Sequence, residues 1–329
     1  MEAAATTPTR RALPRASGPR FADPLLRGVL GGIAVGVLVL IGFFFIKLIL
    51  ESEPAFRHTG VLDFVFSNNW VPSRGLYGAL PLVIGTLLTA VIALAIGVPV
   101  AVASALYITE LAPRRLRGPL TLLIELLAAV PSVVYGLWGI FFLAPKLLPA
   151  EKWFSSTFDF LPFVGGTVSI PNYFIAGLIL AIMIVPIVSA ISREVMATVP
   201  HDHKEAALAL GATRWEMIRI AVLPYSRAGI SGAGMLGLGR AIGETIAVTI
   251  VIGNAAVIGD GIFSQGYTLA AVIANEFGEA ASDPVHRASL IAAGLVLFIL
   301  TLAVNLVARY YVNRASGASA RKVPVGMAG

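Results

Sequence analysis

An arginine and a glutamate lie four residues apart in the otherwise apolar stretch GLGRAIGETIAVTIVIGN (237–254). At this spacing, Arg240 and Glu244 share one face of a helix. An ionisable group at bilayer depth costs about 2.5–3.5 kcal/mol on insertion scales, so such groups usually face a cavity or a partner. The pair therefore has two interpretations: an ion pair that only neutralises Arg240, or part of a path for an anion. We expect the path, because a purely structural pair is a costly way to fill a helix face.

Two other polar patterns could do chemistry, and neither predicts a metal site. Glu125, in LLIELLAAVPS, could pair with Arg240 on a neighbouring helix or lie near the membrane interface and reach water; we favour the interface. The histidines of His201-Asp202-His203 do not share a helix face, because they alternate, and no further ligand is nearby in the sequence. We expect a solvated helix start there, with Asp202 as a cap.

These residues belong to a chain with the composition of a membrane protein. The sequence is 57% hydrophobic and 13% charged, whereas a soluble domain is about 25% charged. Its mean hydropathy is +0.86. It has no cysteine, which excludes disulfides and thiolate metal sites. The net charge of +6 comes from basic residues clustered in particular loops, so nucleic-acid binding is a poor interpretation.

Apolar runs long enough to cross a bilayer divide the chain. We predict an all-α polytopic membrane protein with about six transmembrane helices. Its predicted parts are a disordered cytoplasmic tail at 1–26, a first transmembrane helix at 27–50, an extracytoplasmic loop at 51–76, a transmembrane domain at 77–311 and a cytoplasmic tail at 312–329. The five further spans are expected at 77–109, 118–143, 173–191, 228–254 and 288–311. Pro81 and Pro99 favour a kink in the first of these five.

The basic residues predict the orientation of these spans. Most Lys and Arg fall at 10–27, 114–117, 193–227 and 309–322. The positive-inside rule places such segments in the cytoplasm. Both termini are then expected on the cytoplasmic side.

A polar loop between the fourth and fifth spans has the sequence HDHKEAALALGATRWEMIRIAVLPYS (201–226). Its pattern predicts two short helices that are joined at Gly211, the second ending at Pro224. Three apolar residues on this segment, Trp215, Met217 and Ile218, suggest a docking surface. A packed connector between spans would show the same pattern.

Six residues of this loop resemble, at the family's spacing, the EAA motif of ABC importer permeases: Glu205, Ala206, Ala207, Gly211, Leu223 and Pro224. The resemblance implies a type I ABC importer permease fold in which these residues couple the chain to a dimer of separate ATPase subunits. Ala221, where the family usually has Ile, is the one departure. The chain has no G-x-x-x-x-G-K-[ST] sequence, so it cannot cradle ATP in the P-loop manner. ATP and Mg²⁺ are therefore expected on the partner ATPase, with no cofactor, metal or catalytic residue on this chain.

Four stretches are similar to phosphate-importer permeases of the PstC type: YGALPLVIGTLLT (77–89), PSVVYGLWG (131–139), GLGRAIGETIAVTIVIGN (237–254) and YTLAAVIANEF (267–277). This resemblance implies a multi-pass protein of the bacterial plasma membrane, surrounded by lipid, that transports inorganic phosphate. The implied protein partners are a second permease of the PstA type, an ATPase dimer and an extracytoplasmic phosphate-binding protein.

The residues of the predicted path suit phosphate. Arginine presents a planar fork that matches phosphate oxygens, and the hydroxyls of Ser132 and Thr245 can donate hydrogen bonds without adding charge. Too many cations would trap the ion. One arginine, Arg240, moderated by Glu244, fits a site that must also release its ligand.

Other functions fit the sequence less well. The same machine could carry another oxyanion, such as sulfate, molybdate or a phosphonate, because only the resemblance favours phosphate. A stand-alone secondary transporter is disfavoured by the loop at 201–226 and by the lack of repeat halves in the sequence. An intramembrane enzyme is the least favoured class, since the spans contain no paired aspartates, no serine–lysine dyad and no H-E-x-x-H.

Overall fold

The computed structural model describes residues 22–161 and 163–320, in two compact units, Met1–Lys47 and Leu48–Gly329. The described part of the first unit is the larger portion of helix α1 (Ala22–Thr59), whose side chains there are almost all exposed. Apolar residues cover every side of this helix, which is the pattern of a helix surrounded by lipid or by other helices. Most of the predicted tail at 1–26 lies outside the described residues.

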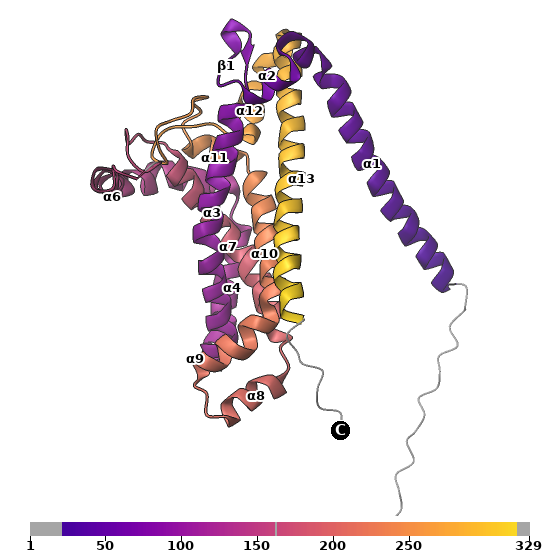
Figure 1. Ribbon diagram of the computed structural model, residues 1–329, viewed down its shortest axis with the longest axis vertical. Coiled ribbons are helices and arrows are strands. Elements are labelled where there is room, and N and C mark those ends of the chain that lie inside the picture. Colours follow the sequence, from indigo (N-terminus) through magenta and orange to yellow (C-terminus); the bar gives the residue numbers. More distant parts are fainter. Residues whose placement is uncertain (1–21, 162, 321–329) are drawn as a thin grey trace, which may run out of the picture. The chain divides into compact units, whose positions relative to one another are not determined.

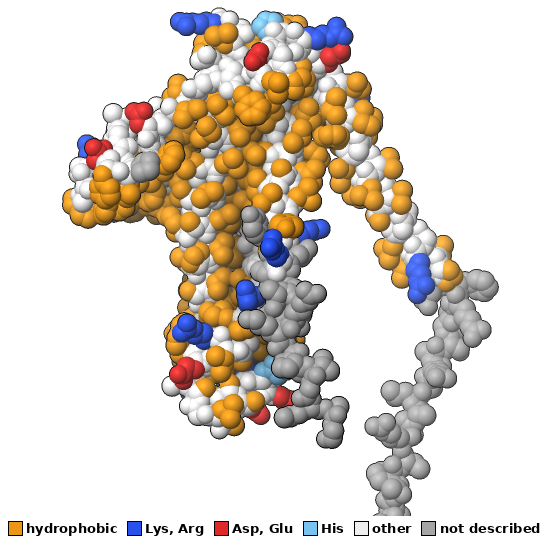
Figure 2. Space-filling view, in the orientation of Figure 1, with side chains coloured by type: hydrophobic (Ala, Val, Ile, Leu, Met, Phe, Trp, Pro, Cys, Tyr) orange, Lys and Arg blue, Asp and Glu red, His pale blue; other side chains and the backbone are white. Residues whose placement is uncertain are grey.

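Four long helices of the second unit run side by side (Figure 1): α3 (Leu80–Leu106), α7 (Tyr173–Ala197), α10 (Leu223–Ile242) and α13 (Pro284–Ala320). Shorter elements close the two ends of this bundle: α8 (His201–Ala209) and α9 (Arg214–Met217) at one end, and α2 (Val61–Phe66), β1 (Trp70–Val71) and α12 (Leu269–Glu276) at the other. Figure 2 shows apolar side chains over most of the side of the bundle. Such a surface suits the hydrocarbon of a membrane.

Five helices among the described residues are long and apolar enough to cross a membrane: Pro24–Thr59, Leu80–Leu111, Ser132–Thr157, Tyr173–Ala197 and Pro284–Tyr310. The span predicted at 228–254 is not one continuous helix, because α10 ends at Ile242 and α11 (Ile246–Val251) follows after a break. Together α10 and α11 cover that predicted span. The all-α polytopic fold is confirmed, and a short hairpin of β1 with β2 (Leu76–Tyr77) is a small addition to it.

Two details near the start of the chain differ from the expectation. Helix α1 continues to Thr59, past the predicted end at residue 50. An ion pair between Glu53 and Arg57, at the i, i+4 spacing, favours the extra turns, and Ala55 is buried beside Phe64. Pro81 does not kink α3, because it lies in the first turn, where an N–H group has no helical partner to lose.

A proline interrupts the span predicted at 118–143. Its place is taken by three helices and a π-helical turn: α4 (Arg114–Ala129), α5 (Ser132–Trp138), η3 (Gly139–Leu143) and α6 (Ala144–Thr157). Val130 has an extended backbone, the conformation that a following proline such as Pro131 favours. The hydroxyl of Tyr135 donates a 2.7 Å hydrogen bond to the carbonyl of Leu127 across this break. It therefore gives a partner to an acceptor at the end of α4.

Helices α3 and α7 form the centre of the bundle, and glycines let them approach closely. A Cβ atom at Gly97 would lie 2.9 Å from the carbonyl oxygen of Ala181, and one at Gly177 would lie 2.6 Å from the Cβ atom of Ile92. Close packing of this kind holds helices together in lipid, where the hydrophobic effect between them is absent.

A polar cluster ties the hairpin to the end of the bundle. The indole N–H of Trp70 donates to a carboxylate oxygen of Glu276, and Nε2 of His286 lies 3.0 Å from the same oxygen. Tyr77 stacks on the His286 ring. Burial raises the pKa of the Tyr77 hydroxyl, and the nearby carboxylates of Asp283 and Glu276 raise that pKa further. The predicted loop at 51–76 is thus largely ordered structure.

We expect Gly85→Ala to destabilise the bundle by about 1–3 kcal/mol. A Cβ atom at Gly85 in α3 would collide with the carbonyl oxygen of Tyr267 and lie 3.2 Å from the ring of Tyr173. Gly234→Ala is the matched control, because its Cβ atom would meet only Val98, at 3.8 Å. Thermal unfolding of the solubilised protein should show a lower midpoint for the Gly85 variant and an unchanged or higher one for the control. Equal midpoints would contradict the close packing described for α3.

Candidate functional site

The break between α10 and α11 carries the two charges of the apolar stretch. A guanidinium nitrogen of Arg240 lies 3.4 Å from one carboxylate oxygen of Glu244. The other carboxylate oxygen accepts a 3.3 Å hydrogen bond from the backbone N–H of Ala247 in the first turn of α11. The two residues do not lie on one continuous helix, as was predicted, because α10 ends at Ile242, between them. The contact survives because Glu244 folds back toward Arg240 while it caps α11.

The two charged side chains have unequal surroundings. The Glu244 side chain is 6% exposed, whereas the Arg240 side chain is 45% exposed. Leu236 and Ile246, before and after Arg240 in the chain, are exposed as well. Glu244 is therefore fixed inside the protein, and Arg240 keeps N–H donors that another group could bind.

The two interrupted spans meet at this level. A Cβ atom at Gly136 in α5 would contact Ala247 in α11, and one at Gly139, at the end of α5, would contact Val251. The two helices therefore run in the same direction, with their first residues at the same end of the pair. Ser132, half-buried, is the first residue of α5.

Thr245, also half-buried, directly precedes α11, and its hydroxyl donates to the carbonyl of Gly243. Because α5 and α11 begin side by side, the structure brings Ser132 to the same end of the pair as Glu244 and Thr245. Arg240 joins this group through its ion pair. The four residues predicted for the path thus lie at the two helix breaks.

Glu125 does not pair with Arg240. Its carboxylate lies 3.4 Å from Arg193 of α7, and its side chain is more than half exposed. Another nitrogen of Arg193 donates to the hydroxyl of Thr121. Of the two alternatives for Glu125, the pairing with Arg240 is wrong, and the exposure agrees with a position near an interface.

The loop at 201–226, called the EAA loop below, has the predicted break at Gly211. This residue has φ of 85°, in the left-handed region that favours glycine. Thr213 and Glu216 form a capping box at the start of α9, and the hydrogen bonds from Thr213 lower the pKa of the Glu216 carboxyl. Asp202 is not a cap, since Pro200 precedes α8 without a side-chain hydrogen bond.

The second helix of the EAA loop does not stop at the predicted residue. A π-helical turn, η4 (Ile218–Val222), leads from α9 directly into α10. Pro224 is tolerated because it lies in the first turn of α10. The EAA loop is therefore continuous with the helix that carries Arg240.

The EAA loop has a buried face and an exposed face. Ala207, Met217 and Ile218 are buried in a cluster that also contains Ala105 of α3 and Met196 of α7. Two of the three apolar residues expected at the surface are therefore core residues, because the loop packs onto the helix ends.

The exposed face of the EAA loop is also apolar. Among the predicted coupling residues Glu205, Ala206, Gly211 and Pro224 are exposed and Leu223 is half-buried. Trp215, Leu210, Ile220 and Tyr225 are exposed there, and all but Trp215 were missed from the sequence. Their spacing in the sequence could have predicted their exposure, because apolar residues on both faces of a short helix cannot all point inward. This face suits a protein partner.

An apolar bundle with two helix breaks and a packed loop with an exposed apolar face is the architecture of a polytopic membrane protein that has a partner-binding surface at one end. The chain belongs to the family of binding-protein-dependent transport system inner membrane components, whose family model matches residues 97–317.

Among known proteins, the chain is 43% identical over 302 residues to the phosphate transport system permease protein PstC of Mesorhizobium japonicum, covering 90% of this chain and 92% of that protein. The protein of the same name from Xylella fastidiosa is 41% identical over 300 residues, with the same coverages. A solved bacterial ABC transporter involved in the import of the acidic polysaccharide alginate matches 89% of this chain and 98% of its own, with a TM-score of 0.60 and 17% identity. This last likeness shows a shared fold.

Two variants separate the cap from the charge at Glu244. Glu244→Ala removes the acceptor for the Ala247 N–H group and should destabilise the protein by about 1–3 kcal/mol. Glu244→Gln keeps an acceptor oxygen of the same size and should destabilise it less. Thermal unfolding of the solubilised protein measures both effects. Equal losses of stability in the two variants would mean that Glu244 stabilises the protein by pairing with Arg240 and not by capping α11.

Proposed function

We propose that this chain is the membrane-spanning permease subunit of an ATP-driven importer of inorganic phosphate. The observation that carries the proposal is its similarity, over 90% of its length, to proteins named phosphate transport system permease protein PstC. The fold shared with an alginate importer supports the same kind of machine. The chain is a non-catalytic subunit, and ATP with Mg²⁺ binds to a separate ATPase.

Phosphate passes the helix breaks in this proposal. Arg240 offers part of its guanidinium fork to phosphate oxygens, while Glu244 holds the other part and limits how tightly the ion is retained. Ser132 and Thr245 add hydroxyl donors at the starts of α5 and α11. A second permease of the PstA type lies opposite the exposed residues Leu236 and Ile246, and the aqueous path forms between the two subunits.

The EAA loop couples this path to ATP hydrolysis. Its exposed apolar residues form the surface on which an ATPase subunit docks, and a shallow groove beside them is lined by His203, Ala206, Ile220, Pro224 and Tyr225. An extracytoplasmic phosphate-binding protein delivers the ion at the opposite end of the bundle. The EAA loop and both termini are then cytoplasmic, in a bacterial plasma membrane.

Another oxyanion remains the nearest alternative cargo. Sulfate, molybdate and phosphonates also present oxygens that a guanidinium can bind. Uptake of labelled phosphate by cells that depend on this chain should be suppressed by excess unlabelled phosphate and not by excess sulfate. Suppression by sulfate to the same extent would favour the alternative.

Arg240→Gln tests the path. The variant keeps a long polar side chain but loses the charge, so phosphate uptake should fall roughly tenfold or more, while assembly with the ATPase is retained. Arg287→Gln is the matched control, since Arg287 is also exposed but lies in the first turns of α13. Normal uptake with Arg240→Gln would contradict the path. Exchanging the two charges is a poor test, because an arginine at 244 could not accept from the Ala247 N–H group.

Gly211→Val tests docking of the EAA loop. A β-branched residue in the left-handed region costs about 1–2 kcal/mol, and a Cβ atom there meets no other group within 4 Å. The change thus alters the turn between α8 and α9 without a clash. Stimulation of ATP hydrolysis by the loaded binding protein should fall several-fold. Gly211→Asn is the control, because asparagine tolerates this conformation. Full stimulation of an assembled Gly211→Val complex would contradict docking through this loop.

A further inference from the structure

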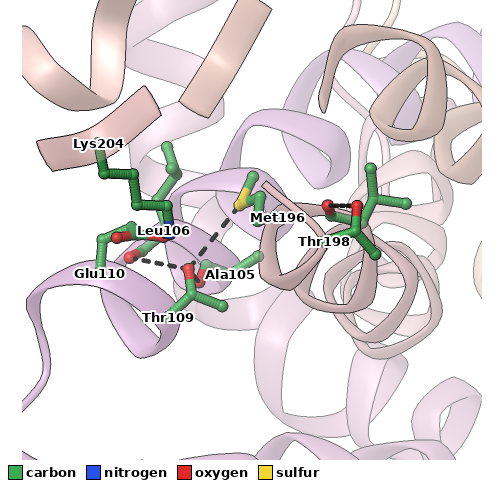
Figure 3. A network of polar contacts seen from close by, with 8 residues as sticks. Ala105, Leu106, Thr109, Glu110, Met196, Thr198 and Lys204 are labelled. Atoms are coloured by element: carbon green, nitrogen blue, oxygen red, sulfur yellow. Dashed lines mark hydrogen bonds and ion pairs between the residues drawn. The ribbon is translucent and has the colours of Figure 1, made fainter. Parts of the chain in front are cut away.

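One ion pair joins the EAA loop to a membrane-crossing helix. The ammonium nitrogen of Lys204, in α8, lies 2.6 Å from a carboxylate oxygen of Glu110, and the two side chains are only 15% and 10% exposed. Glu110 belongs to η2 (Tyr107–Leu111), a π-helical turn that ends α3. Figure 3 shows the two side chains pointing toward one another, beside Thr109 and Met196. The other ion pairs found within 22–161 and 163–320 do not involve the EAA loop.

The remaining contacts between the EAA loop and the helix ends are of a different kind. Ala207 and Met217 pack on Ala105 and Met196 in an apolar cluster. Apolar contacts are non-directional, so this cluster fixes no particular atom of α8 to an atom of α3 or α7. An ion pair with a short N–O distance fixes one atom to another. Lys204 and Glu110 therefore form the directional link between α8 and α3.

Among the described residues, Lys204 forms its ion pair with Glu110 and with no other acidic side chain. A crevice of about 530 Å³ beside the pair is also lined by Arg117, Glu125, Arg193, Glu194 and His201. Glu125 is engaged by Arg193, and Arg117 donates to the carbonyl of Ala112. Glu194, the other acidic side chain of the crevice, makes no ion pair in the described part of the chain, so Glu110 is the charge partner of Lys204 in this arrangement.

We propose that the Lys204–Glu110 pair transmits displacement of the EAA loop to α3. This inference rests on the proposed function, because the displacement comes from an ATPase docked on the loop. From η2 the movement continues along α3, which packs closely on α7 at Gly97 and also contacts α10, where Val98 faces Gly234. Helix α10 carries Arg240. Lys204 and Glu110 are positioning residues in this proposal, since they act through the helices and not on phosphate or ATP. A π-helical turn at this joint fits the frequent occurrence of such turns at functional sites.

The test uses the complete complex, with the second permease, the ATPase and the phosphate-loaded binding protein, in lipid vesicles. Glu110→Gln keeps the size of the side chain and removes its charge. We expect basal ATP hydrolysis to be retained and both its stimulation by loaded binding protein and phosphate uptake per ATP to fall roughly fivefold or more. The double variant Glu110→Lys with Lys204→Glu should restore at least half of the stimulation. Glu53→Gln is the matched control, because it breaks the exposed pair with Arg57 by the same chemical change.

Three results would overturn the proposal. One is full stimulation of the Glu110→Gln complex. A second is a fall in total stimulated activity that comes only from a smaller amount of assembled complex, while stimulation and uptake per assembled complex are unchanged. The third is an assembled charge-exchanged complex that remains unstimulated, and this variant decides the matter if Glu110→Gln does not assemble. Gly211→Val, measured alongside, separates the ion-pair proposal from the docking proposal. If Gly211→Val loses stimulation and Glu110→Gln keeps it, only the ion-pair proposal is contradicted. If Gly211→Val keeps normal stimulation, docking through the EAA loop is contradicted.

Discussion

Every backbone polar group at bilayer depth must find a partner inside the protein, because hydrocarbon offers none. Two helix breaks in this bundle leave such groups without helical partners. At the first, the Tyr135 hydroxyl donates to the Leu127 carbonyl; at the second, the Glu244 carboxylate accepts from the Ala247 N–H group. The second solution buries a negative charge, and Arg240 balances it. Glu244 thus serves the break and the ion pair at once, and Arg240 keeps an exposed side, which the proposed path uses.

The elements that carry the two functional regions are in direct contact. Helix α10 begins in the EAA loop and ends at the break, so it connects the exposed apolar face of that loop to Arg240 along the chain. Helix α3 lies beside α7 and α10 and is joined to α8 by Lys204 and Glu110. In the proposed mechanism, a movement of the EAA loop would therefore reach the path by two routes, one through the backbone and one through an ion pair. The close packing of glycines on α3 makes the second route stiff.

Hydropathy alone predicted most of the membrane-crossing segments, because a bilayer demands long apolar runs. The EAA motif located the loop, and Gly211 predicted its turn correctly because glycine adopts that backbone with the least strain. The sequence could not show that Met217 is buried while Ile220 is exposed, since both are apolar residues on one short segment. It could not pair Lys204 with Glu110 either, because 94 positions separate them and no local pattern links them. The candidate path residues were placed together by the packing of α5 on α11, which depends on Gly136 and its neighbours in space.

The central claim is that the face carrying Arg240 lines an aqueous path for phosphate. The chain has no cysteine, so Ile246→Cys, on that exposed face, gives it a single thiol. In the assembled complex, a charged thiol reagent that cannot cross lipid should label this thiol, and phosphate should slow the labelling. Val91 of α3 is 59% exposed, against 49% for Ile246, and we expect it to face lipid, so Val91→Cys should resist the same reagent. Failure to label Ile246→Cys in a complex that still transports phosphate, or labelling that phosphate leaves unchanged, would contradict the account.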